Sequence, residues 1–205
     1  MKKFIVIALT SLFSYGVSAQ TDSTRKSHPF KLDFLLSSDF INTSYGSHFG
    51  SIVKAKWAIH SGQHLEWFMG IASRHSYLQE SSNRFTEYVD GFTLDGGAYF
   101  VSELLLYPFR KKHFFIGVEP YAGVTHTFSK GTWKTDFDNH ERTFKHHYTY
   151  FDYGISQSIG VRIRQFSIKC EAWLSLKGVL DGGRSRLADF DSRFLPSIGF
   201  GYYFN

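Results

Sequence analysis

Few residues of this sequence have types and spacings that could do chemistry. Ser73 and His75 stand two residues apart, and Glu80 follows them. Acyl transfer to a serine needs a hydroxyl nucleophile, an imidazole that takes its proton and a carboxylate that orients the imidazole. The order and spacing of these three residues match no deacylase motif. They are therefore weak catalytic candidates, and we expect no enzymatic activity.

Ten histidines raise the question of a metal site. Metal sites hold their ligands at ~2.0–2.6 Å in a fixed shell, and the spacing here matches no compact ligand motif. We therefore expect neither a metal nor another cofactor. The residues considered are His140, His146 and His147, with Asp136, Asp138 and Asn139 beside them.

The N-terminus has the pattern of an export signal. Lys2 and Lys3 precede the short apolar run 4–13, and a small-x-small pattern follows it. We predict a cleaved signal peptide over residues 1–19 and a short periplasmic tail over residues 20–28. Cleavage lowers the formal net charge from +5 to +3, which is too mild for a nucleic-acid-binding protein. The sequence has one cysteine, so no internal disulfide stabilises the exported chain.

The remaining chain alternates apolar and polar residues with the period of two that β-strands show. From 151 to 163, the odd positions are mostly apolar and aromatic, whereas the even positions hold Asp, Gly, Ser and Arg. Similar segments recur along the chain and predict eight strands. The predicted strands cover residues 30–41, 48–60, 64–78, 98–109, 113–128, 151–164, 166–177 and 194–204.

The predicted connections alternate between short and long. The short ones are 60–63, 110–112 and 164–165, and the long, polar ones are 42–47, 79–94, 129–146 and 181–192. An even number of strands with short turns at one end and long loops at the other is typical of an outer-membrane barrel. Ten residues at a rise of ~3.3 Å, tilted by ~45°, reach about 23 Å, which suits the apolar band of such a barrel.

The export signal, the eight alternating segments and the aromatic-rich last strand, Ile198 to Phe204, resemble the small outer-membrane β-barrels of the OmpA/OmpX type. The resemblance implies an all-β, eight-stranded, antiparallel, up-and-down transmembrane barrel over residues 29–205. It also implies an integral location in the cell outer membrane, among lipid and lipopolysaccharide. Members usually end on an aromatic residue, which implies recognition by the barrel-assembly machinery; here Asn205 follows Phe204.

The alternation places many charges inside the predicted barrel. Eight strands leave room only for side chains, so these charges must pair or bind water to offset their desolvation. We therefore predict a plugged lumen, and we place Glu103 inside because a carboxylate facing lipid is costly. The seven acids are Asp33, Asp39, Glu66, Glu103, Glu119, Asp152 and Glu171, and the eight bases are Lys31, Lys54, Lys56, Arg74, Arg162, Arg164, Lys169 and Lys177.

Aromatic and basic residues mix in the predicted long loops, as they do on recognition surfaces. Such loops would bind a protein or another surface ligand, or their aromatic residues would fold back on the rim and order the loops. We expect a structural or loop-mediated binding role. The candidate residues are Trp133, Phe137, Phe144, Arg184, Arg186 and Phe190.

Three other interpretations stay open. An accessory component of an envelope secretion or assembly system would meet its partner at periplasmic turns such as 110–112. A lipid-modifying enzyme would use Ser73 and His75 at the outer rim. A soluble, lipocalin-like barrel would invert the faces, with apolar residues around an internal ligand pocket. Short and long connections at opposite ends, and glycines and serines that share the charged face, favour the membrane barrel.

Overall fold

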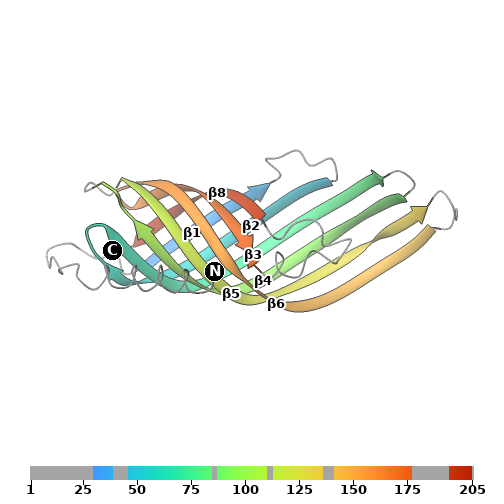
Figure 1. The fold of residues 1–205 in the computed structure, drawn as a ribbon, viewed down its shortest axis with the longest axis horizontal. Helices are drawn as coiled ribbons and strands as arrows, with labels where there is room; N and C mark the ends of the chain where they lie inside the picture. Colours follow the sequence, from blue (N-terminus) through green and yellow to red (C-terminus); the bar gives the residue numbers. More distant parts are fainter. Residues whose placement is uncertain are drawn as a thin grey trace, which may run out of the picture.

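The structure is a computed structural model, and it describes residues 30–38, 46–84, 87–109, 113–135, 141–176 and 194–204. Eight strands in these residues form a closed barrel, in which each strand pairs antiparallel with the next (Figure 1). The ring closes where the last strand pairs with the first, with Phe30 opposite Phe204. The strands are β1 (Phe30–Ser38), β2 (Gly46–Ser61), β3 (Leu65–Arg84), β4 (Glu87–Leu106), β5 (Phe114–Thr135), β6 (Glu141–Ile163), β7 (Phe166–Ser175) and β8 (Phe194–Phe204).

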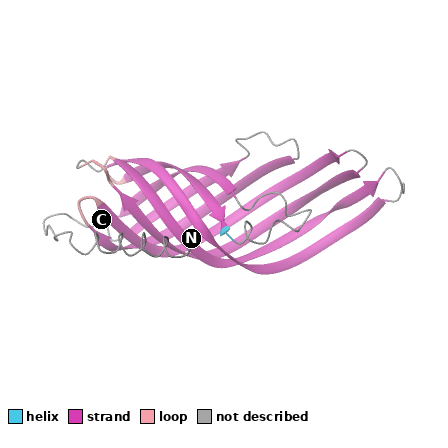
Figure 2. Ribbon diagram, viewed as in Figure 1, coloured by secondary structure: helices cyan, strands magenta, loops and turns pink. Residues whose placement is uncertain are grey.

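Strands account for almost all of the coloured ribbon in Figure 2. The predicted fold class, an eight-stranded, antiparallel, up-and-down barrel, is therefore confirmed. In the residues that the structure describes, no helix has the length and apolar character needed to cross a membrane.

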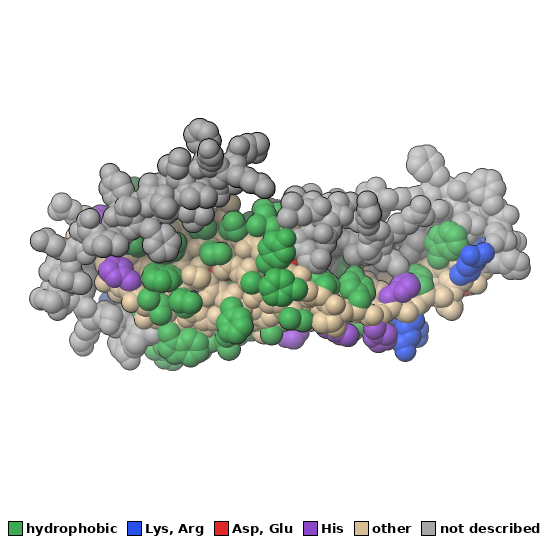
Figure 3. All heavy atoms as spheres, turned by 60° about the horizontal axis from the view of Figure 1, so that its bottom comes forward, with side chains coloured by type: hydrophobic (Ala, Val, Ile, Leu, Met, Phe, Trp, Pro, Cys, Tyr) green, Lys and Arg blue, Asp and Glu red, His purple; other side chains and the backbone are tan. Residues whose placement is uncertain are grey.

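The two faces of the strands differ sharply in burial. Along β6, Phe151 and Ile163 are 58% and 61% exposed, whereas Asp152 and Arg162 are 0% and 7% exposed. Apolar side chains gather over the outer surface of the barrel in Figure 3. A lipocalin-like barrel would have the opposite arrangement, and the described strands do not show the inverted faces that this alternative predicts.

Strands β3 to β6 are longer than the sequence predicts. The expected loops 79–94 and 129–146 are largely strands, since β3 runs to Arg84 and β4 begins at Glu87, while β5 runs to Thr135 and β6 begins at Glu141. These segments are rich in Thr, Tyr, Phe and Trp, which favour strands. Polar residues occupy both faces of these segments. The alternation of apolar and polar residues that predicts a strand is therefore weak there. We call residues 79–84, 87–94, 129–135 and 141–148 the β3–β6 extension; Figure 1 shows it continuing past the other four strands.

The described connections at the opposite end are short. Gly62 donates its backbone N–H to the carbonyl of Leu65 at 2.8 Å. Arg164 and Gln165 alone join β6 to β7, and Arg164 has a positive φ of 58°. The prediction that Arg164 lies inside the barrel is wrong: the residue is exposed, because it stands in the turn where the alternation ends.

Candidate functional site

The middle of the barrel holds a compact cluster of buried ion pairs. Lys56 Nζ lies 2.6 Å from Asp33 Oδ2, 2.7 Å from Glu103 Oε2 and 3.0 Å from Glu119 Oε2. Every side chain of the cluster is at most 4% exposed. Since four cations face four carboxylates, the cluster is neutral. We call it the central cluster; its members are Lys31, Lys54, Lys56, Lys169, Asp33, Glu103, Glu119 and Glu171.

Lys169 and Lys54 link carboxylates from different strands within the central cluster. Lys169 Nζ lies 2.8 Å from Glu171 Oε2, 3.0 Å from Asp33 Oδ2 and 3.5 Å from Glu103 Oε1. Lys54 forms ion pairs with both Glu119 and Glu171. The network thereby connects strands on opposite sides of the barrel.

Two further ion pairs lie at the ends of the lumen. Towards the short turns, Arg162 Nη1 lies 3.1 Å from Glu66 Oε2, and Tyr107 Oη donates a hydrogen bond to the same oxygen at 2.8 Å. Towards the extension, Arg74 Nη2 lies 3.5 Å from Asp152 Oδ2. In the described strands, the buried charges therefore number six cations and six carboxylates.

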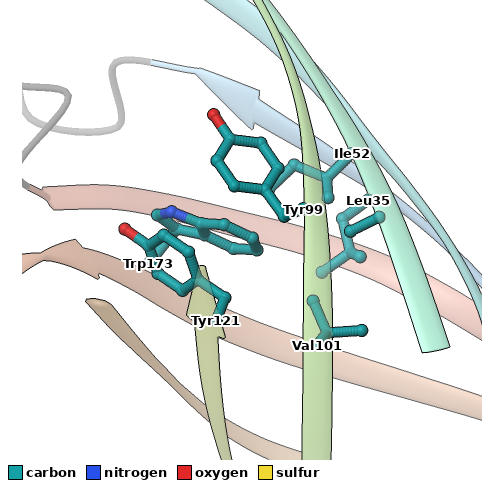
Figure 4. Packing of buried hydrophobic residues seen from close by; sticks show 7 residues of the cluster. Leu35, Ile52, Tyr99, Val101, Tyr121 and Trp173 are labelled. Atoms are coloured by element: carbon teal, nitrogen blue, oxygen red, sulfur yellow. The ribbon is translucent and has the colours of Figure 1, made fainter. Parts of the chain in front are cut away.

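Apolar and aromatic side chains fill the lumen on both sides of the central cluster. On the extension side, the rings of Tyr121 and Trp173 lie 3.9 Å apart between centroids, and Tyr99 meets Trp173 at 5.4 Å. Figure 4 shows Trp173 and Tyr121 against one another, beside Leu35, Ile52 and Val101. A second group closes the turn side; it comprises Phe68, Leu105, Tyr107, Phe115 and Tyr203.

Glycines make room for these large side chains. A Cβ on Gly123 would lie 2.6 Å from Tyr99 Cα and 2.8 Å from its ring, and one on Gly154 would lie 2.6 Å from the Tyr121 hydroxyl. The sequence showed that glycine shares the inward face. The structure adds the reason: these glycines let neighbouring strands and large rings approach closely.

The structure places twelve of the charged residues predicted for the lumen inside the barrel. Asp39 and Lys177 lie outside the described residues. The sequence could not assign the ion pairs themselves, because their members are far apart along the chain. Lys169 and Asp33, for example, are 136 positions apart.

Two of the six residues expected in binding loops lie on strands instead. Trp133 belongs to β5 and Phe144 to β6, and both are half-buried on the β3–β6 extension. The predicted loop position is wrong because strand pairing continues through both residues. The other four, Phe137, Arg184, Arg186 and Phe190, lie outside the described residues.

Trp133 and Phe144 are ordered by contacts on the sheet. The Arg142 guanidinium lies 5.7 Å from the Trp133 ring, directly across the strand pair. Phe144 covers Gly131, where a Cβ would lie 2.6 Å from its ring, and it stacks on His146 at 5.8 Å. The extension thus presents an aromatic and basic surface whose side chains pack against one another.

β6 pairs over different lengths with its two neighbouring strands. β6 pairs with β5 from Glu141 onwards, whereas its pairing with β7 begins only at Gly154.

The weak catalytic candidates prove to be closer than the sequence suggests. Ser73 Oγ lies 2.9 Å from His75 Nε2, on the outward face of β3. The backbone of Glu80 belongs to β3, and its side chain lies outside the described residues. Side chains two apart on a strand often fail to touch, so the sequence alone could not reveal this hydrogen bond.

The histidines considered for a metal do not come together in the described chain. His146 and His147 are adjacent on β6 and therefore point to opposite faces of the sheet. His140 lies outside the described residues. Within the described ranges, no group of three or more histidine, cysteine or acidic side chains could hold a metal ion.

Comparison with known proteins adds little to this description. No family model matches the sequence, and no curated protein does. A similar solved structure is the crystal structure of Ail, the attachment invasion locus protein of Yersinia pestis. It shares 10% identity, the match covers 85% of this chain and 96% of that chain, and the TM-score is 0.42. The structure itself is a closed ring of eight antiparallel strands, with apolar side chains outside and charged side chains inside.

Proposed function

We propose that this protein is an integral outer-membrane barrel that displays its β3–β6 extension at the cell surface as a binding element. The main support for this proposal is that the barrel exposes apolar side chains and buries charged ones. Phe100, Ile168 and Ile163 are 77%, 62% and 61% exposed, while the charged side chains are buried. A continuous apolar exterior is costly in water and suits lipid, and a closed ring satisfies the backbone groups that lipid cannot.

The height of the apolar surface suits a bilayer. On the outward face of β5, apolar residues run from Phe114 to Val124, and His126, Phe128 and Lys130 follow. Eleven residues at ~3.3 Å, tilted by ~45°, cover about 25 Å, the height of the lipid-facing band of such barrels. The outer boundary of the band therefore lies between His126 and Lys130, where outer-membrane lipid and lipopolysaccharide would surround the barrel.

The two ends of the barrel support an orientation. Short turns face the periplasm in such barrels, and the longer segments face outward. The extension therefore projects from the cell, beyond the lipid. Histidine and basic side chains gather towards that end in Figure 3. Insertion in this orientation would use the barrel-assembly machinery.

The extension has the features of a binding surface. Trp133 and Phe144 pack against neighbouring side chains, and such packing lowers the entropy cost of binding. The filled, neutral lumen then serves as a rigid and non-conducting support for this surface.

Cysteine labelling of intact cells tests the display of the extension. Cys170, the one cysteine in the sequence, is first changed to serine. Thr143→Cys on the exposed face of β6 is then compared with His113→Cys beside the short turn before β5. A membrane-impermeant maleimide is expected to label position 143 in intact cells and position 113 only after permeabilisation. Labelling of position 113 but not position 143 in intact cells would reverse the orientation.

The same two variants separate the binding role from the accessory role. In living cells, a photoreactive crosslinker is attached to the introduced thiol of Thr143→Cys or to that of His113→Cys. Partners captured from position 143 support recognition through the extension. Partners captured only from position 113 support an accessory role in a secretion or assembly system.

A further inference from the structure

The outward face of the barrel carries a groove that the proposed binding role does not use. It has a volume of about 430 Å³ and lies across β2 to β5, near the outer boundary of the apolar band. Its lining includes one row formed by His75, Gly96 and His126 and a second row formed by Tyr77, Leu94 and Phe128. The groove therefore joins polar groups to an apolar trough on the side of the barrel that we assign to lipid.

The register explains why the groove is open between the two histidines. Gly96 pairs with His75 on one side and with His126 on the other, so the three residues form one row. A Cβ on Gly96 would lie 3.6 Å from His75 Nδ1, so a longer side chain would reach into the space between the imidazoles. The glycine leaves room for a ligand group there.

Ser73 lies beside the groove and contacts His75, which lines it. Ser73 Oγ lies 2.9 Å from His75 Nε2, so with the proton on Nδ1 the imidazole accepts the hydrogen bond of the serine hydroxyl. Ionisable side chains that face lipid are costly, and they mark functional sites more often than structural ones. Ser73 and His75 belong to the outward surface of the barrel. They lie nearer the short turns than the row of Tyr77, Leu94 and Phe128.

A hydrogen-bond donor stands at the other side. His126 Nδ1 lies 2.8 Å from Thr149 Oγ1. When the threonine hydroxyl donates this bond, the His126 proton is on Nε2, which is then available to a ligand. A preset donor of this kind stabilises the negative charge that develops on a carbonyl oxygen during acyl transfer.

We propose that the groove is a hydrolytic site for long-chain acyl esters of outer-leaflet lipids. Ser73 Oγ attacks the ester carbonyl carbon while its proton passes to His75 Nε2, and His126 stabilises the oxyanion. The bond to the alcohol oxygen breaks, and His75 protonates the leaving alcohol. Water then attacks the acyl-serine, gives a proton to His75, and releases the fatty acid as Ser73 recovers its proton. The apolar wall holds the acyl chain.

Fatty-acid release by the purified full-length protein tests this site. The protein is incubated in detergent micelles with either an ester-linked glycerophospholipid or an acylated glucosamine lipid, and released fatty acid is measured by mass spectrometry. The two lipids distinguish the two sources of the ester. Ser73→Ala and His75→Ala are expected to lower the rate at least ~100-fold, and His126→Ala roughly 100-fold.

Ser102 supplies the matched control. It faces outward on β4 and accepts a hydrogen bond from Trp67 Nε1 at 2.9 Å, away from any described histidine pair. Ser102→Ala should leave the rate unchanged, and a fluorophosphonate probe should label Ser73 in this variant and in the parent. All variants must keep the folded gel mobility of the parent. Absence of fatty-acid release from both lipids, or full activity in Ser73→Ala, would overturn the proposal without affecting the proposed binding role.

Discussion

Replacing Lys169 with methionine is expected to lower the free energy of unfolding of the barrel by about 3 to 5 kcal/mol, the usual cost of breaking a buried ion pair from one side. Lys169 is fully buried and touches three carboxylates, those of Asp33, Glu103 and Glu171. Its loss gives the central cluster a net charge of −1 in a site from which bulk water is excluded. The remaining lysines already have carboxylate partners of their own and compensate only in part.

Urea unfolding in lipid vesicles measures this effect, with the fraction of folded barrel read from gel mobility. Lys145→Met on the exposed face of β6 is the matched control and should change the free energy of unfolding by no more than about 0.5 kcal/mol. The double variant Lys169→Met with Glu171→Gln restores neutrality and should recover part of the loss. Equal unfolding midpoints for Lys169→Met and Lys145→Met would contradict the central cluster.

Phe100→Arg is expected to destabilise the barrel by about 2 to 4 kcal/mol, the cost of a cation on the lipid face near the bilayer midplane. Phe100 is 77% exposed, and its strand neighbours are Ile71 and Ala122. It lies six residues before the end of β4, which is about 14 Å along the membrane normal at a tilt of ~45°. In a protein surrounded by water, the same change at so exposed a residue would cost almost nothing.

The same unfolding measurement tests this prediction. Thr143→Arg introduces the same cation on the outward face of the extension, beyond the apolar band, and should leave the unfolding midpoint unchanged. If the two arginine variants unfold at the same urea concentration, the apolar surface is not in contact with lipid.

Much of the fold follows from the period of two in the sequence. In β6 from Asp152 onwards, and in β7 apart from Trp173, every second residue is small, polar or charged, and those residues face the lumen. The alternation therefore determines which side chains are buried, because a strand must present successive residues to opposite faces. It also places Glu103 inside although both faces of β4 are apolar, since lipid would not tolerate the carboxylate.

Other features depend on contacts that no local pattern reveals. Lys169 meets Asp33 because β7 and β1 are both neighbours of β8, and the spacing of these residues in the chain says nothing of this. The strands of the extension have polar residues on both faces. Their alternation of apolar and polar residues is therefore weak, and the sequence predicts loops at these positions. The Ser73–His75 hydrogen bond depends on side-chain rotamers, and the groove beside it depends on Gly96 from another strand.

The central claim is that a barrel with a charged interior and an apolar exterior is embedded in the outer membrane. The most direct test is fractionation of expressing cells, followed by gel electrophoresis of the outer-membrane fraction with and without boiling. We expect to recover the protein in the outer-membrane fraction. Its gel mobility should change on heating, because a closed barrel stays folded in detergent until it is boiled. Recovery as a soluble periplasmic protein would contradict the central claim.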